Sequence, residues 1–523
     1  MEAVPQCARG LLSGHGAGLH ARAHMQNCSL RNVFVISLFL VEPTQVLTMS
    51  LSQRSLRAMK PLSSYFPIAA AALERPWTPS DPRGNIVMVI AENRLMSERF
   101  MARWRECGPP SRAALFYSDF RGTSGLRSAV ASCMSRHVTR THAIAPEQVA
   151  LGNGCGSVLD TLFHVLCDEG DACLLPAPLY PTFCNDLESR ANVEVQVVPT
   201  LQENGFFPTV DALERASASA AARGHPPKVL LLTNPTNPLG TVWPADSMRG
   251  AIEWATAQGL HVVSDEIYAA SVFGEGCAPF ESAWDIAAAH LSDDDARRRV
   301  HVVYGLAKDF GVSGFRAVSG RCLNRLPRPH GAQSSARPEQ LGLESSDDPT
   351  RAASHSRQGA VATRHEGIIK AWENLGYMTT IPGVVQEGLA EMLNDEGWVD
   401  SFLHDNRAAL RASFNTLAAA LDEERVPRDG GGAAMFAWLD LRGALPESPT
   451  WEDERRFFER MHGPDPETQG GGVLLTPGGD CFASEPGFFR ACWAATPPEA
   501  HAEAARRIAA AMAANLAKHR GSR

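Results

Sequence analysis

The sequence lacks a long hydrophobic run. Its one uninterrupted apolar stretch near the start, residues 33–41, is far shorter than the roughly 20 residues needed to span a bilayer. A polar leader of 32 residues precedes this stretch, whereas the charged region in front of the apolar core of a signal peptide is short. We therefore expect neither a membrane span nor a secretory signal.

The cysteines form no metal or disulfide pattern. All twelve are scattered between Cys7 and Cys492, without a CxxC pair or a His/Cys cluster at zinc spacing. This usage is typical of a reducing compartment rather than of a disulfide-stapled secreted protein. We therefore expect a cytoplasmic protein without a metal site.

The chain also has no excess of basic charge. It carries 49 basic and 58 acidic residues, a net charge of -9, and the two signs are interspersed. No continuous basic face is available to neutralise nucleic-acid phosphates. The sequence therefore argues against a nucleic-acid partner.

Two segments lack the patterns of folded elements. Residues 1–48 show no periodicity and are expected to be a disordered extension, with a mispredicted start as the alternative. Residues 324–366 contain no aromatic residue and no isoleucine and are rich in Ser, Pro, Arg, Asp and Gly. They are predicted to be a polar insertion in a surface loop, with translated non-coding sequence as the alternative.

Elsewhere, short apolar runs alternate with helical patterns. The runs lie at 172–175, 193–198, 228–232, 261–264 and 300–304, and helical patterns such as 157–167, 210–222 and 244–258 lie between several of them. This alternation predicts an α/β domain with a mostly parallel sheet between helices. After about residue 382, long amphipathic helices around short strands indicate a smaller α+β domain.

These patterns predict three parts after the extension. Residues 49–120 would form an N-terminal arm and part of the small domain, residues 121–380 the large domain with its insertion at about 324–366, and residues 381–523 the rest of the small domain. A chain of 523 residues with 44% hydrophobic content can bury the cores of two or three domains.

Polar and reactive side chains follow four of the predicted strands, where ligands of an open α/β sheet bind. The run VAL at 149–151 is followed by GNGCGS, residues 228–232 by TNPTNPLG, residues 261–264 by DEIY and residues 300–304 by GLAKDFGVSGFR. A helix N-terminus with small residues and Arg316 suit a phosphate group. Lys308 suits an aldehyde and Asp265 a protonated pyridine nitrogen. One cofactor, pyridoxal 5'-phosphate (PLP), needs all of these groups.

The motifs resemble those of fold type I PLP enzymes in the class I/II aminotransferase family, and within it the 1-aminocyclopropane-1-carboxylate (ACC) synthase subgroup. The resemblance covers about residues 60–323 and 367–515. It rests on seven motifs in family order: IAENRL (90–95), DFRGTSGLR (119–127), LPAPLYPTF (175–183), TNPTNPLG (233–240), SDEIY (264–268), AKDFGVSGFR (307–316) and TPGGDCFASEPGFFRACWA (476–494). It implies a large PLP-binding domain with a mostly parallel mixed sheet and a smaller α+β domain.

The resemblance also implies a role for each matching residue. Lys308 would carry PLP as a Schiff base and shuttle protons, and Asp265 would pair with the pyridine nitrogen. Further cofactor contacts would come from Asn237 and Tyr268 at the phenolic oxygen, Tyr180 against the ring, and Cys155, Gly156, Ser157 and Arg316 at the phosphate. Arg490 would bind the substrate α-carboxylate, and Glu92 would lie near the substrate.

Most of these residues also have an ordinary structural interpretation. Lys308 could be a surface lysine, Asp265 or Ser157 a helix N-cap, and Cys155 a buried space-filling residue. Tyr180 could be core packing, Arg490 part of a salt bridge, and Glu92 a solvated loop residue. The order of the motifs favours the catalytic interpretation of Lys308 and Asp265, while Cys155 and Glu92 remain evenly balanced.

Three departures from the subgroup bear on the reaction. Phe120 stands where ACC synthases carry a tyrosine whose hydroxyl reaches the cofactor of the partner subunit, which argues against ACC synthesis. Gly305 replaces a phosphate-binding serine, and Gly156 replaces a common threonine. Neutral hydrogen bonds contribute about 1 kcal/mol each, so weaker PLP binding is expected than in relatives.

The sequence thus predicts a PLP-dependent, aminotransferase-type enzyme that acts on an α-amino acid or an amino-acid conjugate, as a homodimer like its family. The chain is similar to fungal secondary-metabolite aminotransferases and carbon-sulfur lyases. A carbon-sulfur β-lyase of an epidithiodioxopiperazine-type pathway is therefore the main alternative. An ACC synthase and a non-catalytic relative are two further ones.

Overall fold

The computed structural model describes residues 63–314, 359–463 and 471–521, together with Ser52, Arg54, Ser55 and Met59. The chain divides into two units, Met1–Lys60 and Pro61–Arg523. The sheets, the helices around them and the candidate site all belong to the second unit.

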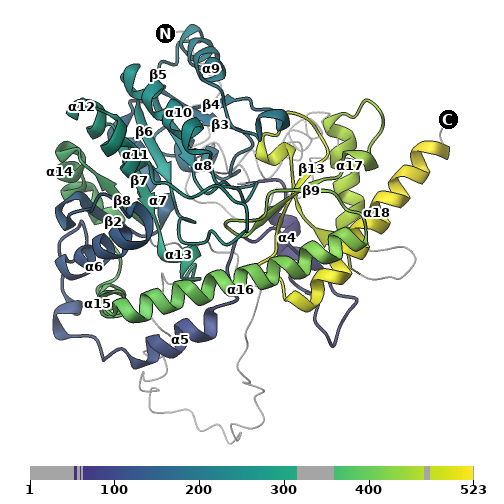
Figure 1. Cartoon of the computed structure of the whole chain (residues 1–523), viewed down its shortest axis with the longest axis horizontal. Helices are drawn as coiled ribbons and strands as arrows, with labels where there is room; N and C mark the ends of the chain where they lie inside the picture. The colour runs from purple at the N-terminus through teal and green to yellow at the C-terminus, as the bar shows by residue number, and fades with distance from the viewer. Residues whose placement is uncertain are drawn as a thin grey trace, which may run out of the picture. The chain divides into compact units, whose positions relative to one another are not determined.

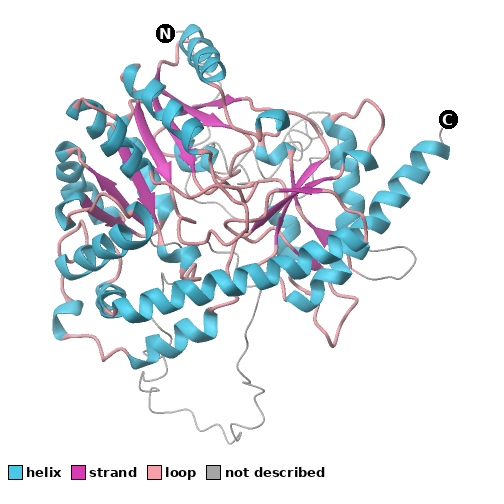
Figure 2. Cartoon of the chain, in the orientation of Figure 1, coloured by secondary structure: helices cyan, strands magenta, loops and turns pink. Residues whose placement is uncertain are grey.

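A seven-stranded sheet forms the centre of the larger lobe of this unit (Figures 1 and 2). Its order is β2-β8-β7-β6-β5-β3-β4, and β8 alone runs antiparallel to its neighbours. The strands are β2 (Val149–Gly152), β3 (Ala172–Pro176), β4 (Glu194–Val198), β5 (Pro227–Thr233), β6 (His261–Asp265), β7 (Val300–Tyr304) and β8 (Gly359–Thr363). The predicted α/β fold with a mostly parallel mixed sheet is confirmed.

Helices cover both faces of this sheet because its strands bury apolar side chains on both sides. Leu174 and Leu230 pack with one group of helices, and the next residues, Leu175 and Leu231, pack with the other. The first group is α6 (Ser124–Met134), α9 (Val210–Ala222), α10 (Ala245–Ala257), α11 (Ala283–His290) and α15 (Gly383–Asn394). The second is α7 (Cys155–Leu166), α8 (Phe183–Glu188) and α14 (Glu366–Leu375).

A four-stranded antiparallel sheet of order β12-β13-β10-β9 forms the smaller lobe. Its strands are β9 (Arg428–Asp429), β10 (Phe436–Asp440), β12 (Thr476–Pro477) and β13 (Phe488–Cys492), and the helices of this lobe include α17 (Trp451–His462) and α18 (His501–Gly521). A parallel pair, β1 (Ile86–Val87) with β11 (Val473–Leu474), links the N-terminal segment to the chain before β12. The predicted smaller α+β part is thus present.

The 28-residue helix α16 (Glu396–Glu423) connects the two lobes and runs past both sheets in Figure 1. Val399 and Phe402 near its start pack in the core of the larger lobe, whereas Leu417 and Leu421 near its end pack with the smaller one. The remaining helices used below are α4 (Phe66–Ala72), α5 (Ser97–Glu106), α12 (Asp294–Arg298) and α13 (Leu306–Asp309). Within the described residues, no helix combines the length and apolar character needed to cross a membrane.

The predicted polar insertion ends earlier than residue 366. Strand β8 lies inside the predicted segment, yet all five of its residues are buried and it pairs with strands on both sides. A Cβ atom on Gly359 would lie 2.6 Å from the backbone nitrogen of Cys155, so only glycine fits this approach to α7. The sequence pattern does not predict this strand, because GAVAT contains only small side chains. Residues 1–48 and the start of the predicted insertion, as far as residue 358, lie outside the described residues.

Helix α15 belongs to the larger lobe, whereas the sequence predicts that the second part of the small domain begins at residue 381. The side-chain oxygen of Gln386 accepts a 2.7 Å hydrogen bond from the backbone of Thr123, at the start of α6. Val385 and Leu389 share a hydrophobic cluster with Leu126 of α6. An amphipathic pattern indicates that a helix has an apolar face but not which core receives that face. The two lobes therefore meet within α16.

Candidate active site

The carboxyl ends of β5, β6 and β7 meet at one edge of the large sheet. Thr233 at the end of β5 lies in register with Asp265 at the end of β6, and β7 is the next neighbour. The segments that begin with Asn234, Glu266 and Gly305 therefore leave the sheet side by side. They carry three of the predicted site residues, Asn237, Tyr268 and Lys308, and a fourth, Asp265, is the last residue of β6.

Lys308 lies on the short helix α13, directly after β7, and its side chain is only 1% exposed. Its Nζ donates a hydrogen bond to the backbone carbonyl of Ala91, in the predicted IAENRL motif. Burying an amine without polar partners is costly. A buried lysine amine at a strand end is the arrangement that covalent attachment of an aldehyde cofactor requires.

The next residue, Asp309, is completely buried and accepts three hydrogen bonds. The donors are the Ser271 hydroxyl at 2.5 Å, the Ala270 backbone at 3.0 Å and the Tyr304 hydroxyl at 3.0 Å. Burial raises the pKa of the Asp309 carboxyl to about 6. This carboxyl joins the turn after Tyr268 to the helix that carries Lys308.

The same network reaches the Ala91 segment from the other side. Asn406 of α16 donates to the Ser271 hydroxyl at 3.4 Å and accepts a 2.7 Å bond from Asn93. This series of hydrogen bonds, from Asn93 to Asp309, thus connects the segment of Ala91 with the helix that carries Lys308. Sequence reasoning missed Asn93, Ser271, Asn406 and Asp309, because each is an ordinary polar residue until the fold brings them together.

Asp265 and Tyr268 are both buried at the end of β6, with exposures of 6% and 3%. Asp265 Oδ1 accepts a 3.3 Å hydrogen bond from the backbone of Ile267, which fixes the carboxylate at the sheet edge. The Tyr268 ring meets Phe436 of β10 edge to face, with 5.4 Å between ring centroids. The predicted carboxylate and phenol therefore lie where the two lobes meet.

Arg490 lies on β13 and is 1% exposed. Its Nη1 donates to Asn237 Oδ1 at 2.9 Å, and its Nη2 donates to Val89 O at 3.0 Å and Thr476 Oγ1 at 2.9 Å. Its guanidinium also lies 5.0 Å from the Phe436 ring centroid. Within the described residues it has no ion-pair partner, and its buried Nε has no acceptor. This cation is therefore placed to receive an anionic group.

Tyr180 is also buried. Its ring meets Phe183 edge to face at 5.2 Å, and the backbone of the preceding residue, Leu179, donates a 2.8 Å bond to Cys481 O. Tyr65, just before α4, is 3% exposed, and burial raises the pKa of its hydroxyl to about 12 although Arg490 acts in the opposite direction. Sequence reasoning did not single out Tyr65, because it lies in the predicted N-terminal arm and belongs to none of the seven motifs.

The start of α7 offers backbone amides for a phosphate. Its N-cap, Gly154, has a positive φ of 98°, and no described side chain caps the helix. The Ser157 hydroxyl donates 2.9 Å to Gly154 O, Cys155 is buried, and a Cβ on Gly156 would have ordinary contact with Asp186 at 3.4 Å. An uncapped helix start made of small residues binds anions through its amides and dipole. With Lys308 and Asp265, these residues fit PLP.

The two remaining predicted residues are Glu92 and Arg316. The Glu92 carboxylate forms a 3.0 Å ion pair with Arg94, so the backbone of Ala91, and not Glu92, supplies the described contact with Lys308. Arg316 lies outside the described residues. The part of the chain that the structure describes contains no cluster of three or more metal-ligating side chains.

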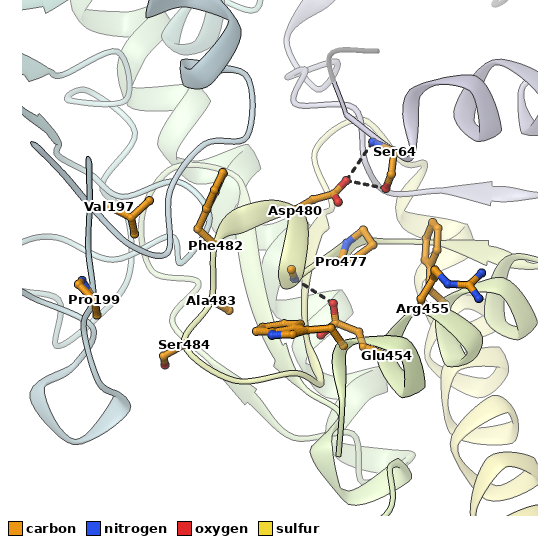
Figure 3. Close-up of a pocket in the computed structure, with 13 residues that line it drawn as sticks. Ser64, Val197, Pro199, Glu454, Arg455, Pro477, Asp480, Phe482, Ala483 and Ser484 are labelled. Atoms are coloured by element: carbon orange, nitrogen blue, oxygen red, sulfur yellow. Dashed lines mark hydrogen bonds between the residues drawn. The ribbon is translucent and has the colours of Figure 1, made fainter. Parts of the chain in front are cut away.

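The loop between β12 and β13 lines a separate cavity of about 720 Å³ (Figure 3). Asp480 Oδ2 accepts hydrogen bonds from the backbone and hydroxyl of Ser64, and Glu454 Oε1 accepts a 2.9 Å bond from Gly479 N. Pro477 lines this cavity, whereas its neighbour Thr476 contacts Arg490. Alternate residues of a strand point to opposite faces, so the cavity lies behind the candidate site.

Comparison with known proteins agrees with this geometry. Residues 109–508 match the family described as aminotransferase class I and II. The chain is 30% identical over 459 residues to 1-aminocyclopropane-1-carboxylate synthase 4 of Oryza sativa subsp. japonica, covering 83% of each protein. It is 28% identical over 427 residues to the synthase CMA101 of Cucurbita maxima, covering 79% of each.

Solved structures show the same fold at lower identity. The aspartate aminotransferase of Thermus thermophilus with maleate matches 89% of this chain and 100% of its own, with a TM-score of 0.64 and 21% identity. The aspartate aminotransferase of Rhizobium meliloti matches 89% of this chain and 99% of its own, with a TM-score of 0.65 and 17% identity. At such identities the likeness concerns the fold alone.

Proposed function

The chain belongs to the class I and II aminotransferase family, and on that premise we propose that it is an aminotransferase-type enzyme acting on an α-amino acid or an amino-acid conjugate. It is a PLP-dependent enzyme, as the family is. The observation that carries the proposed reaction is that the Lys308 amine and the Arg490 guanidinium are both buried and donate to backbone carbonyls only two residues apart, those of Ala91 and Val89. Arg490 also has no anionic partner among the described residues. An amino acid presents a carboxylate beside its reacting carbon. The Arg490 guanidinium suits the carboxylate, and the Lys308 amine suits the reacting carbon.

We assign the cofactor contacts to the residues at the strand ends. When bound, PLP supplies an aldehyde that reacts with amines and a ring that accepts electrons. Asp265 would hold the proton on the ring nitrogen, and the first turn of α7 would bind the phosphate. Asn237 Oδ1 is already used by Arg490, so its Nδ2 is left to donate to the phenolic oxygen together with the Tyr268 hydroxyl.

Lys308 and Arg490 would do the remaining work on the substrate. The Lys308 amine would hold the cofactor and then move the proton at the substrate α-carbon. Three of the five N–H groups of Arg490 are used in the described contacts, and two, including Nε–H, are left for the substrate carboxylate. A bidentate contact of this kind fixes the orientation of the α-carbon.

Carbon-sulfur lyase chemistry is the second candidate. The similar relatives named above are ACC synthases, and the likeness to aminotransferases comes from the family match and from the fold. Phe120 lacks the hydroxyl that the ACC synthase subgroup carries, which disfavours that specific reaction.

We propose a role in secondary metabolism on the resemblance alone. A cytoplasmic location fits the described cysteines such as Cys133, Cys173 and Cys492, which are free thiols.

The visible spectrum of the PLP-saturated protein tests the reaction. Candidate amino acids and cysteine conjugates are added without an oxo acid, and ammonia and free thiol are assayed in parallel. Stoichiometric loss of the visible cofactor band without ammonia identifies an aminotransferase. Catalytic release of ammonia and thiol, with the band retained, identifies a lyase. A protein that develops no visible band with PLP would support the non-catalytic alternative.

We also propose that the enzyme is a homodimer. Leu115, Phe116, Tyr117, Tyr377 and Met378 are large apolar side chains that remain exposed, Tyr117 by 88%. Several of them surround Phe120 and line one cavity of about 820 Å³. An exposed apolar patch of this kind marks an interaction site. A second copy of the chain is the proposed occupant, since family members assemble through the surface near this position.

A further inference from the structure

The turn that follows Tyr268 lines a cavity of about 350 Å³, and three basic side chains line the same cavity. His137 comes from a short helical turn after α6, Arg140 follows that turn, and Arg407 comes from α16. The rest of the lining is the 269–280 segment, which contributes small and apolar residues and Cys277. Among the residues that the structure describes, no acidic side chain lines this cavity.

The two arginines lack counterions. Within residues 63–314, 359–463 and 471–521, neither Arg140 nor Arg407 forms an ion pair or a side-chain hydrogen bond. The Arg140 guanidinium lies 5.9 Å from the Phe280 ring centroid. Burial lowers the pKa of Arg407, and the charge of Arg140 lowers it further. The two cations are therefore close enough to repel each other.

The neighbouring carboxylates are engaged elsewhere. Asp400 pairs with Arg136 at 2.5 Å and lies 3.1 Å from His137 Nε2. Asp309 attracts Arg407, but it accepts bonds from three other donors in the Lys308 network. Arg140 is exposed and Arg407 is half-buried, so solvent screens part of the positive charge, but no described carboxylate forms an ion pair with either guanidinium group.

We propose that this cavity is a binding site for a small oxyanion, such as a phosphate group, distinct from the cofactor site. Guanidinium groups bind such anions through paired, charge-assisted hydrogen bonds. The Ala270 backbone, which lines the cavity, also donates to Asp309. A bound anion would therefore lie next to the hydrogen-bond network that positions Lys308. This assignment does not depend on which reaction the enzyme performs.

Thermal unfolding with inorganic phosphate tests the site. Excess PLP in every sample keeps the cofactor's own phosphate contacts filled, and sodium chloride at equal ionic strength is the reference. A ligand that binds only the folded state raises the midpoint by mass action. Phosphate is expected to stabilise the wild type, and Arg407→Gln and Arg140→Gln are each expected to weaken its binding by about tenfold.

Arg298→Gln is the matched control, because it removes the same charge from an exposed position on α12. It should respond to phosphate like the wild type. Arg407→Lys and Arg140→Lys keep the charge and should bind phosphate with intermediate affinity, which provides the comparison if a glutamine variant does not fold. Equal stabilisation of wild type and cavity variants would overturn the proposal. So would a phosphate effect no larger than that of chloride, or one that disappears only in Arg490→Lys.

Discussion

Ser271 donates a 2.5 Å hydrogen bond to the carboxylate of Asp309, the residue directly after Lys308. This bond joins the turn after Tyr268 to the helix that carries the lysine, inside a region without access to water. Asp309→Ala leaves three buried donors without their acceptor, so we expect it to lower the free energy of unfolding by about 2–4 kcal/mol. Ser271→Ala removes one donor and should cost about 1 kcal/mol.

Denaturant unfolding of the two variants measures these costs, and the cofactor spectrum reports the position of Lys308. Asp309→Asn keeps an acceptor and should fall between the two other variants in stability. If Asp309→Ala is no less stable than Ser271→Ala, the carboxylate does not organise the network.

Lys308 is predicted to attach the cofactor covalently. Borohydride reduction of the PLP-loaded wild type should therefore add the mass of the reduced cofactor to the protein, and Lys308→Ala should remain unmodified. Loss of a proton-transferring group should also lower kcat by about 10²–10⁴-fold. The exposed Lys370→Ala is the control and should be labelled like the wild type. Labelling of the Lys308→Ala protein would reject the assignment.

Arg490 is predicted to bind the substrate carboxylate. Arg490→Lys keeps the charge but loses the paired N–H geometry, so kcat/KM for the best amino acid should fall by about 10–100-fold. Activity with the corresponding amine, which has no carboxylate, should change far less. Thr476→Val removes only one neighbour of Arg490 and should have the smaller effect on the amino acid. An equal loss with both substrates would indicate that Arg490 serves only to hold Asn237.

Much of the large lobe follows from local sequence patterns. Strand β7 and helix α9 have the boundaries that the patterns predict. The reason is that β7 is buried on both faces and α9 has one regular buried face. Strand β8 cannot be predicted from its local pattern, because the side chains of GAVAT are small. Gly359 packs directly against the backbone of Cys155. A deletion of residues 325–366 would therefore remove an interior strand and not only a loop.

The candidate site was predictable where motifs directly follow strands. Lys308, Asp265, Tyr268 and Asn237 meet because parallel strands share a carboxyl edge. The Asn93–Asn406 contact joins residues 313 positions apart, and the cavity between Arg140 and Arg407 joins α16 to the turn after α6. Such contacts depend on how helices pack across the sheet, which no local pattern specifies.

Glu266 predicts how stability depends on pH. It is fully buried, accepts hydrogen bonds from Ser264, Ser282 and Ala283, and burial raises its pKa to about 8. Because the folded state holds this proton more tightly than the unfolded state, its contribution to stability is fully present at low pH. The contribution falls as pH rises from about 4.5 to about 8.

Glu266→Gln keeps the shape without the ionisation. The variant should therefore lose less stability than the wild type between pH 5 and pH 8, by an amount on the order of 3 kcal/mol. Urea unfolding at the two pH values measures the difference. Ser282→Ala removes a hydrogen bond that lowers the pKa of Glu266, so it should show a pH-dependent loss of stability at least as large as that of the wild type, with lower stability at both pH values. Parallel losses in wild type and Glu266→Gln would show that Glu266 does not titrate in this range.

The exposed patch around Phe120 predicts the oligomeric state. Light scattering of the wild type should give twice the chain mass, because Phe116 and Tyr117 would be covered by a second copy. Tyr117→Asp places a charge in that contact and should give a monomer with reduced activity. Leu201→Asp changes an exposed leucine that does not line the cavity around Phe120 and should remain a dimer. A wild-type monomer with full activity would contradict the dimer, since each site would then be complete within one chain.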